Sequence, residues 1–360
     1  MSYFQPNITA MAGYVPGEQP SGGKFIKLNT NENPYPCSAK VTAAIKHAVQ
    51  AGLQRYPDPS ASAFRVRASE LLKETVTGIG PDWILCGNGS DDLLTIITRA
   101  LVDPGSCLRY PNPTYILYHT LAEIQGATCH VVDYVQDRSP NGLPSWSLDE
   151  QFTAPDESLR LAILANPNSP SGTQIDPQQV LDIADALPCP LLVDEAYADF
   201  ANSNCLSLVA KNEKILVTRT LSKSYALAGL RFGYLVAQPQ MIEQFNKVKD
   251  SYNCDTLAIA GATAAIDDQA WLTRTRTAIL ATRQRLTNAL SQRGFLCTPS
   301  QANFVWCQHK TIPAAELYRQ LKQDGVLVRY LSYPRWEPGL RISVGTDEQI
   351  DALLTLLERY

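Results

Sequence analysis

The sequence has few charged residues and no strong excess of either sign. Charged residues make up 18% of its 360 residues, against about 25% in an average protein, and the formal net charge is −4. So small a charged fraction, beside 45% hydrophobic residues, argues against long disordered tracts. A weakly acidic chain also has no electrostatic reason to bind nucleic acid or an anionic membrane surface, so we expect neither as a partner.

Other absences concern disulfides, metals and membranes. The nine cysteines are scattered and contain no CxxC pair, which predicts reduced thiols and neither a disulfide framework nor a zinc site. The four histidines show no ligand spacing, so no metal is expected. The N-terminus lacks a basic segment followed by an apolar run, and no apolar run approaches the length of a membrane span. The sequence therefore predicts a soluble, cytoplasmic globular protein.

Short apolar runs typical of buried strands begin near Asp82 and alternate with helix-length patterns. They cover residues 83–86, 161–165, 190–197, 214–219 and 232–237. This alternation predicts an α/β fold with a mainly parallel sheet sandwiched by helices.

A helical region follows at about 257–293, and beyond it shorter strand and helix patterns predict a smaller α+β domain. We therefore expect three parts. Residues 1–36 would form an N-terminal arm and the start of the small domain. Residues 37–256 would form the large α/β domain, and residues 257–360 a linking helix with the C-terminal small domain.

Polar residues follow several of the predicted strands, where ligands gather in a parallel sheet. After WILC, the stretch GNGSDDLL combines glycines with a helix start at Ser90, whose free N–H groups suit a phosphate. A plain strand–turn–helix joint is the alternative. After PLLV, Asp194 puts a carboxylate where it needs a cation or a hydrogen-bond donor, and Tyr197 follows. The alternative there is a capping Asp beside a packed Tyr.

Two further strand ends carry chemistry. The loop NPNSPSGT, after LAILA, directs side-chain amides from the strand end, although each of its residue types also favours a plain turn. In TLSKSYALAGLRFGY, Ser222 and Ser224 flank Lys223. Small neighbours can withdraw a lysine amine from water and favour the nucleophilic neutral form, whereas a single lysine is most often a solvated surface residue. Arg231 stays charged and suits a phosphate or a carboxylate.

Together these groups indicate a pyridoxal phosphate site. A lysine forms an imine with the cofactor's aldehyde, and an acid keeps the pyridine nitrogen protonated. Asn and Tyr side chains bond the 3-oxygen, while helix N–H groups, Ser and Arg hold the phosphate.

The chain resembles the fold-type I pyridoxal-phosphate aminotransferases of class II, and among them the histidinol-phosphate aminotransferases most closely. The resemblance runs nearly end to end, through GYVPGEQP, LNTNENPYP, RYPDP, GNGSDD, NPTYILY, NPNSPSGT, VDEAYADF, TLSKSYALAGLRFGY and LRISVGT. It implies a transaminase of histidine biosynthesis that interconverts L-histidinol phosphate and 2-oxoglutarate with imidazole-acetol phosphate and L-glutamate. An aromatic amino-acid aminotransferase and a threonine-phosphate decarboxylase are the alternatives on the same scaffold.

The resemblance also implies roles for single residues. Lys223 would be the imine lysine and proton shuttle, Asp194 would pair with the pyridine N–H, Tyr197 would bond the 3-oxygen and Tyr115 would stack on the ring. Tyr56 in RYPDP would reach the partner subunit's cofactor, which implies a homodimer. The phosphate would be held by Gly89, Ser90, Asp91, Ser222 and Arg231.

At the substrate end, the resemblance implies that Arg341 in LRISVGT binds the anion. Tyr14, Asn31 and Arg329 would lie around the substrate phosphate. One departure concerns the loop that usually reads NPNNPTG, in which the Asn before PTG bonds the 3-oxygen. Here Ser169 occupies that position, and we expect the neighbouring Asn168 to take the role, with Ser169 as the alternative.

Overall fold

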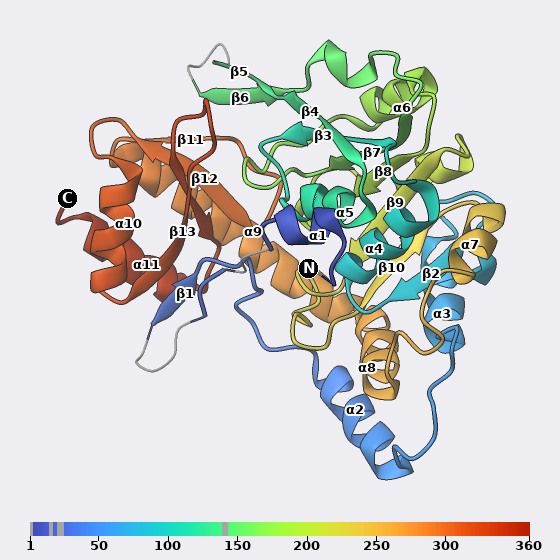
Figure 1. Cartoon of the computed structure of the whole chain (residues 1–360). Coiled ribbons are helices and arrows are strands. Elements are labelled where there is room, and N and C mark those ends of the chain that lie inside the picture. The colour runs from blue at the N-terminus through green and yellow to red at the C-terminus, as the bar shows by residue number, and fades with distance from the viewer. Residues whose placement is uncertain (1–2, 14–16, 20–24, 139–142) are drawn as a thin grey trace.

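The computed structural model describes residues 3–13, 17–19, 25–138 and 143–360, and its strands form two main sheets (Figure 1). In the larger sheet all neighbouring strands run parallel except β10, which is antiparallel to both β2 and β9. The expected mainly parallel α/β sheet is confirmed. Its order is β2 (Ile84–Gly87), β10 (Gly233–Val236), β9 (Ile215–Thr220), β8 (Leu191–Asp194), β7 (Leu159–Ala165), β3 (Cys107–Asn112) and β4 (Thr128–Asp133).

Helices cover both faces of this sheet, because successive side chains of a strand point to opposite sides. Along β8, Leu191 and Val193 pack into one core and Leu192 into the other. The first core is closed by α2 (Ala39–Ala51), α3 (Ser62–Leu72), α6 (Pro177–Ala186) and α8 (Thr256–Ile266). The second is closed by α4 (Ser90–Leu101), α5 (Leu117–Gln125) and α7 (Pro239–Asn246).

The smaller sheet is mixed and combines both ends of the chain. Strand β1 is parallel to β13, and the remaining pairs are antiparallel. Because β1 belongs to the N-terminal arm, we propose the division into 1–36, 37–256 and 257–360 as the domain plan. The order is β1 (Ile26–Leu28), β13 (Val326–Leu331), β14 (Gly339–Ser343), β12 (Phe304–His309) and β11 (Phe295–Cys297), with α9 (Gln269–Gln292), α10 (Ala314–Gln323) and α11 (Asp347–Leu357) packed on it.

The remaining elements are short. Helix α1 (Pro6–Ala10) lies against α5, and β5 (Val135–Arg138) pairs with β6 (Pro144–Ser147) as a hairpin. Single 3₁₀ turns are η1 (Pro81–Trp83), η2 (Glu150–Thr153), η3 (Ala198–Phe200) and η4 (Leu206–Ala210). Across the described ranges, the structure has no helix that is both long enough and apolar enough to cross a membrane.

The start of α4 lies unusually close to the sheet, and Gly233 makes this possible. A Cβ added at Gly233 would lie 2.8 Å from the backbone N of Ser90, 2.8 Å from the carbonyl O of Arg219 and 2.9 Å from the carbonyl C of Gly89. All three are main-chain atoms, which cannot move aside as a flexible side chain could. The absence of a side chain on β10 therefore sets how near the α4 N-terminus comes to the strand ends.

We predict that Gly233→Ala lowers the free energy of unfolding by about 1–3 kcal/mol, because an extra methyl group in this contact forces the backbone apart. Gly229→Ala is the matched control, since its added Cβ would have no heavy atom within 4 Å. Urea unfolding of both variants measures the difference. Equal stability of the two variants would contradict the proposed close packing.

Candidate active site

A cleft of about 760 Å³ lies between the carboxyl ends of the large-sheet strands and the small sheet. The large sheet contributes the ends of β7, β8 and β9, through Ala165, Asp194 and Thr220, and the small sheet contributes Arg329 and Arg341. Most of the predicted site residues line this cleft, although they come from segments far apart in the sequence.

Asp194 ends β8 and lies at the inner wall of the cleft with 5% of its surface exposed. Burial raises its pKa to about 6, against two hydrogen bonds that act in the opposite direction. The Tyr118 hydroxyl donates to Oδ2 at 2.8 Å and the Ala196 N–H donates to Oδ1 at 3.2 Å. No role was predicted for Tyr118, because a buried aromatic residue on a helix looks like core in the sequence.

Lys223 lies in the loop after β9 and extends its amine into the cleft. The Nζ donates to the Thr30 carbonyl at 3.2 Å and lies 5.7 Å from the centre of the Tyr197 ring. The loop itself is held by Asn33, whose Nδ2 donates to the carbonyls of Lys223 at 3.1 Å and Ser224 at 3.0 Å. The backbone is thus fixed while the amine faces the cavity.

An anion-binding corner forms where α4 begins. Gly89 precedes the helix with φ +81° and offers no side-chain cap, so the first-turn N–H groups at Ser90 are not bonded by a capping side chain. Arg231 reaches the same corner and donates through Nη2 to Asp91 at 3.1 Å and through Nη1 to Ser222 Oγ at 3.3 Å. A Cβ at Gly89 would lie 2.5 Å from Arg231 Nη2, so only glycine lets the guanidinium approach.

Tyr115 faces the cleft from the segment before α5, and its hydroxyl donates to Asp91 Oδ1 at 3.2 Å. This bond links the aromatic ring to the anion-binding corner. Its ring also lies edge-on to Tyr118, with 5.7 Å between centroids. Tyr115 is therefore held from two sides.

Asn31 connects the two sheets across the cleft. It is buried, and its Nδ2 donates to the Tyr197 hydroxyl at 3.0 Å. Its Oδ1 accepts from the Ser343 hydroxyl at 2.9 Å, and the Asn31 backbone N–H donates to Ser343 Oγ at 2.8 Å. The Tyr197 ring lies edge-on to Phe304, with 5.0 Å between centroids. Tyr197 is thus oriented by residues of the small sheet.

The structure does not bring Asn168 to the cleft. Its Oδ1 accepts from Thr114 at 2.8 Å, and its Nδ2 donates to the Pro113 carbonyl at 3.1 Å and to Ser171 Oγ at 3.0 Å. The amide therefore joins its own loop to Pro113 and Thr114 in the loop after β3. Ser169 does line the cleft, and its Oγ accepts from Arg341 Nη1 at 2.8 Å. For the bond to the 3-oxygen, the geometry therefore favours Ser169 over Asn168.

Arg329 and Arg341 lie directly opposite each other in the β13–β14 pair, and both line the cleft. Arg341 is held by Ser169 and by the Asn29 carbonyl at 3.1 Å, whereas Arg329 has no hydrogen bond or ion pair within the described ranges. Like charges directly opposite on a sheet destabilise it. An anion between the two guanidinium groups would remove that cost.

Tyr56, another predicted site residue, lies away from the cleft. Tyr56 is 80% exposed and stacks on Tyr252 with 4.5 Å between ring centroids, and it does not line the cleft. Tyr14 lies outside the described residues.

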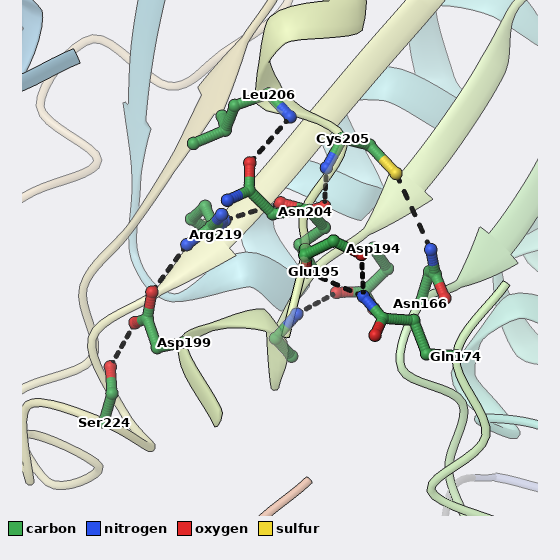
Figure 2. A network of polar contacts seen from close by, with 12 residues as sticks. Asn166, Gln174, Asp194, Glu195, Asp199, Asn204, Cys205, Leu206, Arg219 and Ser224 are labelled. Atoms are coloured by element: carbon green, nitrogen blue, oxygen red, sulfur yellow. Dashed lines mark hydrogen bonds and ion pairs between the residues drawn. The ribbon is translucent and has the colours of Figure 1, made fainter. Parts of the chain in front are cut away.

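A buried charge network that the sequence did not reveal lies behind the cleft (Figure 2). Arg219 on β9 donates through Nε to Glu195 at 2.7 Å and through Nη1 to Asp199 at 2.6 Å. Burial raises the pKa of Glu195, and the charge of Arg219 acts in the opposite direction. Asp199 accepts from the Ser224 hydroxyl. Glu195 follows Asp194 in the chain and Ser224 follows Lys223, so the network fixes both loops relative to each other.

Comparisons with known proteins agree with this arrangement. The family description "Aminotransferase class I and II" matches residues 23–357. The histidinol-phosphate aminotransferase of Rhodopirellula baltica is 52% identical over 99% of this chain and 95% of its own length. Histidinol-phosphate aminotransferase 1 of Nostoc sp. is 44% identical over 99% of this chain and 97% of its own. The solved structure of histidinol-phosphate aminotransferase from Sinorhizobium meliloti in complex with pyridoxal 5'-phosphate superposes with a TM-score of 0.86 at 26% identity, covering 100% of this chain and 98% of that one.

We predict that Arg219→Met lowers the free energy of unfolding by about 3–5 kcal/mol, because it leaves two carboxylates without their buried cation. Arg285→Met is the control. Arg285 also pairs with two carboxylates, Asp347 and Asp351, but at the surface, and its loss should cost less than about 1 kcal/mol. Urea unfolding at neutral pH distinguishes the two, and similar losses would show that the Arg219 network is no more stabilising than a surface cluster.

The pKa of Asp194 predicts a pH dependence of stability. Because the folded pKa of about 6 exceeds the usual 3.8, folding favours the protonated acid. The contribution of Asp194 to the free energy of unfolding is fully present below the pKa of the unfolded state. It is lost as the pH rises through the pKa of the folded state. Between pH 4 and pH 7 the wild type, stripped of small-molecule ligands, should lose about 2 kcal/mol relative to Asp194→Asn, most of a full difference of about 3 kcal/mol at about 1.4 kcal/mol per pKa unit. A constant difference across that range would rule out the raised pKa.

Proposed function

Because the chain belongs to the class I and II aminotransferase family, we propose that it is a pyridoxal-phosphate-dependent transaminase that exchanges an amino group between L-histidinol phosphate and 2-oxoglutarate. The composition of the cleft carries the proposal. A lysine and a buried acid come from the large-sheet side, and two opposed arginines come from the small sheet. The identity to histidinol-phosphate aminotransferases over nearly the whole chain supports the choice of substrate and a place in histidine biosynthesis.

The residues present fit the cofactor. Asp194 is buried and has no ion pair within the described residues, and a protonated pyridine nitrogen is the partner that such a carboxylate lacks. The glycine at 89 keeps room for Arg231 beside the uncapped helix start, which suits a phosphate. We propose that Gly89, Ser90, Asp91, Ser222 and Arg231 hold the phosphate, and that Asp91 orients Arg231 and Tyr115.

When bound, pyridoxal phosphate supplies an electron sink that stabilises negative charge at the amine-bearing carbon of the substrate. The protein supplies the proton transfer and the orientation. We propose that the Lys223 amine anchors the cofactor and moves the proton at that carbon. Its position is set by the Asn33 bonds to its loop and by the Arg219 network.

The ring of the cofactor would lie between three polar groups and one aromatic face. We propose that Asp194 bonds the pyridine nitrogen, that Tyr197, oriented by Asn31, bonds the 3-oxygen and that Tyr115 stacks on the ring. Ser169 replaces Asn168 in this proposal, because the Asn168 amide is already bonded to Thr114, Pro113 and Ser171.

The two substrates differ in the anion that they offer. Glutamate presents a carboxylate beside its amine, whereas histidinol phosphate presents a phosphate ester there. The guanidinium fork of arginine binds either anion. We propose that Arg341 and Arg329 bind it, with Asn31 and Tyr14 at the same end of the cleft.

We also propose a homodimer in the cytoplasm. A large aromatic side chain as exposed as Tyr56, already braced by Tyr252, is suited to insertion into a partner subunit. In the dimer it would reach the partner's cofactor. All nine cysteines are free, which is usual in a reducing compartment.

We predict a higher kcat/KM for histidinol phosphate than for phenylalanine, because the substrate's phosphate uses the arginine pair. Lys223→Ala should lower kcat at least roughly 10³-fold, since the proton transfer is lost. Lys247→Ala, whose amine bonds only the exposed Gln244 side chain, is the control and should retain activity. A preference for phenylalanine would identify an aromatic aminotransferase, release of carbon dioxide would identify a decarboxylase, and a fully active Lys223→Ala would reject the proposed role of the lysine.

A further inference from the structure

The segment 332–338, between β13 and β14, forms part of the cleft wall through Ser332, Tyr333 and Pro334. It connects two strands of the small sheet, but its side chains contact residues of β4 and β6. The Arg335 guanidinium contacts Asp133, the last residue of β4, at 2.6 Å. Trp336 stacks on Trp146 of β6 with 4.6 Å between ring centroids.

The same segment is also fixed from the small-sheet side. The Gln308 Nε2 donates to the Glu337 carbonyl at 3.0 Å, and the Trp336 N–H donates to the Tyr333 carbonyl at 3.1 Å. A Cβ at Gly339 would lie 2.4 Å from the Trp306 ring, so the chain re-enters β14 in tight contact with β12. Tyr333 is therefore carried on a short turn held at both ends.

Tyr333 lines the same cleft as the arginine pair and follows Arg329 by four residues in the chain. Burial raises its pKa to about 12, and the charges of Arg341 and Arg329 act against that rise. At neutral pH the hydroxyl is protonated and can donate. In the described part of the chain it has no hydrogen-bond partner.

The number of donors at this end of the cleft matters for the shape of the anion. A carboxylate has two oxygens in a plane, which a single guanidinium fork can satisfy. A phosphate monoester has three terminal oxygens, which form a tetrahedron around phosphorus together with the ester oxygen. Arg341 is already positioned by Ser169 and Asn29, and Arg329 lies opposite. A third donor from the adjacent wall would complete a site for three oxygens.

We propose that Tyr333 is a specificity-determining residue, whose hydroxyl donates to the third oxygen of a phosphate monoester bound between Arg329 and Arg341 and so favours phosphate over carboxylate. The inference rests on the proposed function for the identity of the ester, but the binding selectivity itself does not depend on turnover.

The test measures binding to the holoenzyme by calorimetry, so that the cofactor's own phosphate site is occupied. The probes are propyl phosphate and glutarate, neither of which carries an amine to transfer. Tyr333→Phe should weaken propyl phosphate binding roughly tenfold or more, as expected for a hydrogen bond to a charged group, and change glutarate binding less than about twofold. Tyr330→Phe is the control, since Tyr330 stacks on Tyr318 and does not line the cleft.

An unchanged affinity of Tyr333→Phe for propyl phosphate, or an equal loss for both probes, would overturn the proposal. With histidinol phosphate as substrate, Tyr333→Phe should raise KM and leave kcat unchanged, which a general distortion of the site would not do. If the wild type fails to transaminate histidinol phosphate while the selectivity for propyl phosphate depends on Tyr333, the proposed function fails and this inference stands. If the wild type transaminates histidinol phosphate while propyl phosphate binding does not depend on Tyr333, the proposed function stands and this inference fails.

Discussion

The Arg219–Glu195 ion pair is the interaction on which the geometry of the cleft depends. Both side chains are buried, so each charge needs the other, and neither can be removed alone without leaving an uncompensated charge. Asp199 extends the pair to Ser224. The two loops that carry Asp194 and Lys223 leave adjacent parallel strands, and strand pairing alone does not fix loops beyond the strand ends. The network supplies that restraint from below the cleft.

The small sheet is held against this frame by polar bonds across the cleft. Asn31 joins Tyr197 to Ser343, and Arg341 joins Ser169 to Asn29. Arg341 is therefore placed relative to the large sheet by a few directional contacts close to the cleft. Helix α9 reinforces the arrangement farther away, since Arg283 donates to the Ala302 carbonyl at 2.8 Å and Phe200 packs with Ile279. An anion bound at Arg341, as we propose, would thus act on the contact between the sheets.

The continuous apolar runs predicted the strands that are buried on both faces, because a short run of this kind between turn residues is typical of a buried strand. This pattern missed β3, because Arg109 interrupts its apolar run although the residue is buried. It also missed β4, because this edge strand is partly exposed and has no continuous apolar run. The site residues at strand ends could be predicted because chemistry restricts their types. Asn168 could not be placed, since sequence does not say which of two neighbouring polar side chains turns inward. Tyr118 and Arg219 act through contacts with residues distant in the sequence.

The charges of the cleft explain why shape must decide between substrates. Arg231 is paired with Asp91, which leaves that corner nearly neutral until a strongly negative group arrives, whereas Arg329 and Arg341 place two like charges opposite each other in the small sheet. A transaminase uses one site for both of its substrates in turn, so this positive end must accept a carboxylate and a phosphate alike. The positive charge attracts both the carboxylate and the phosphate, and by itself it discriminates poorly between them. Discrimination therefore has to come from donors placed for a tetrahedral anion, which a rigid turn between two strands can hold more accurately than a long flexible cation.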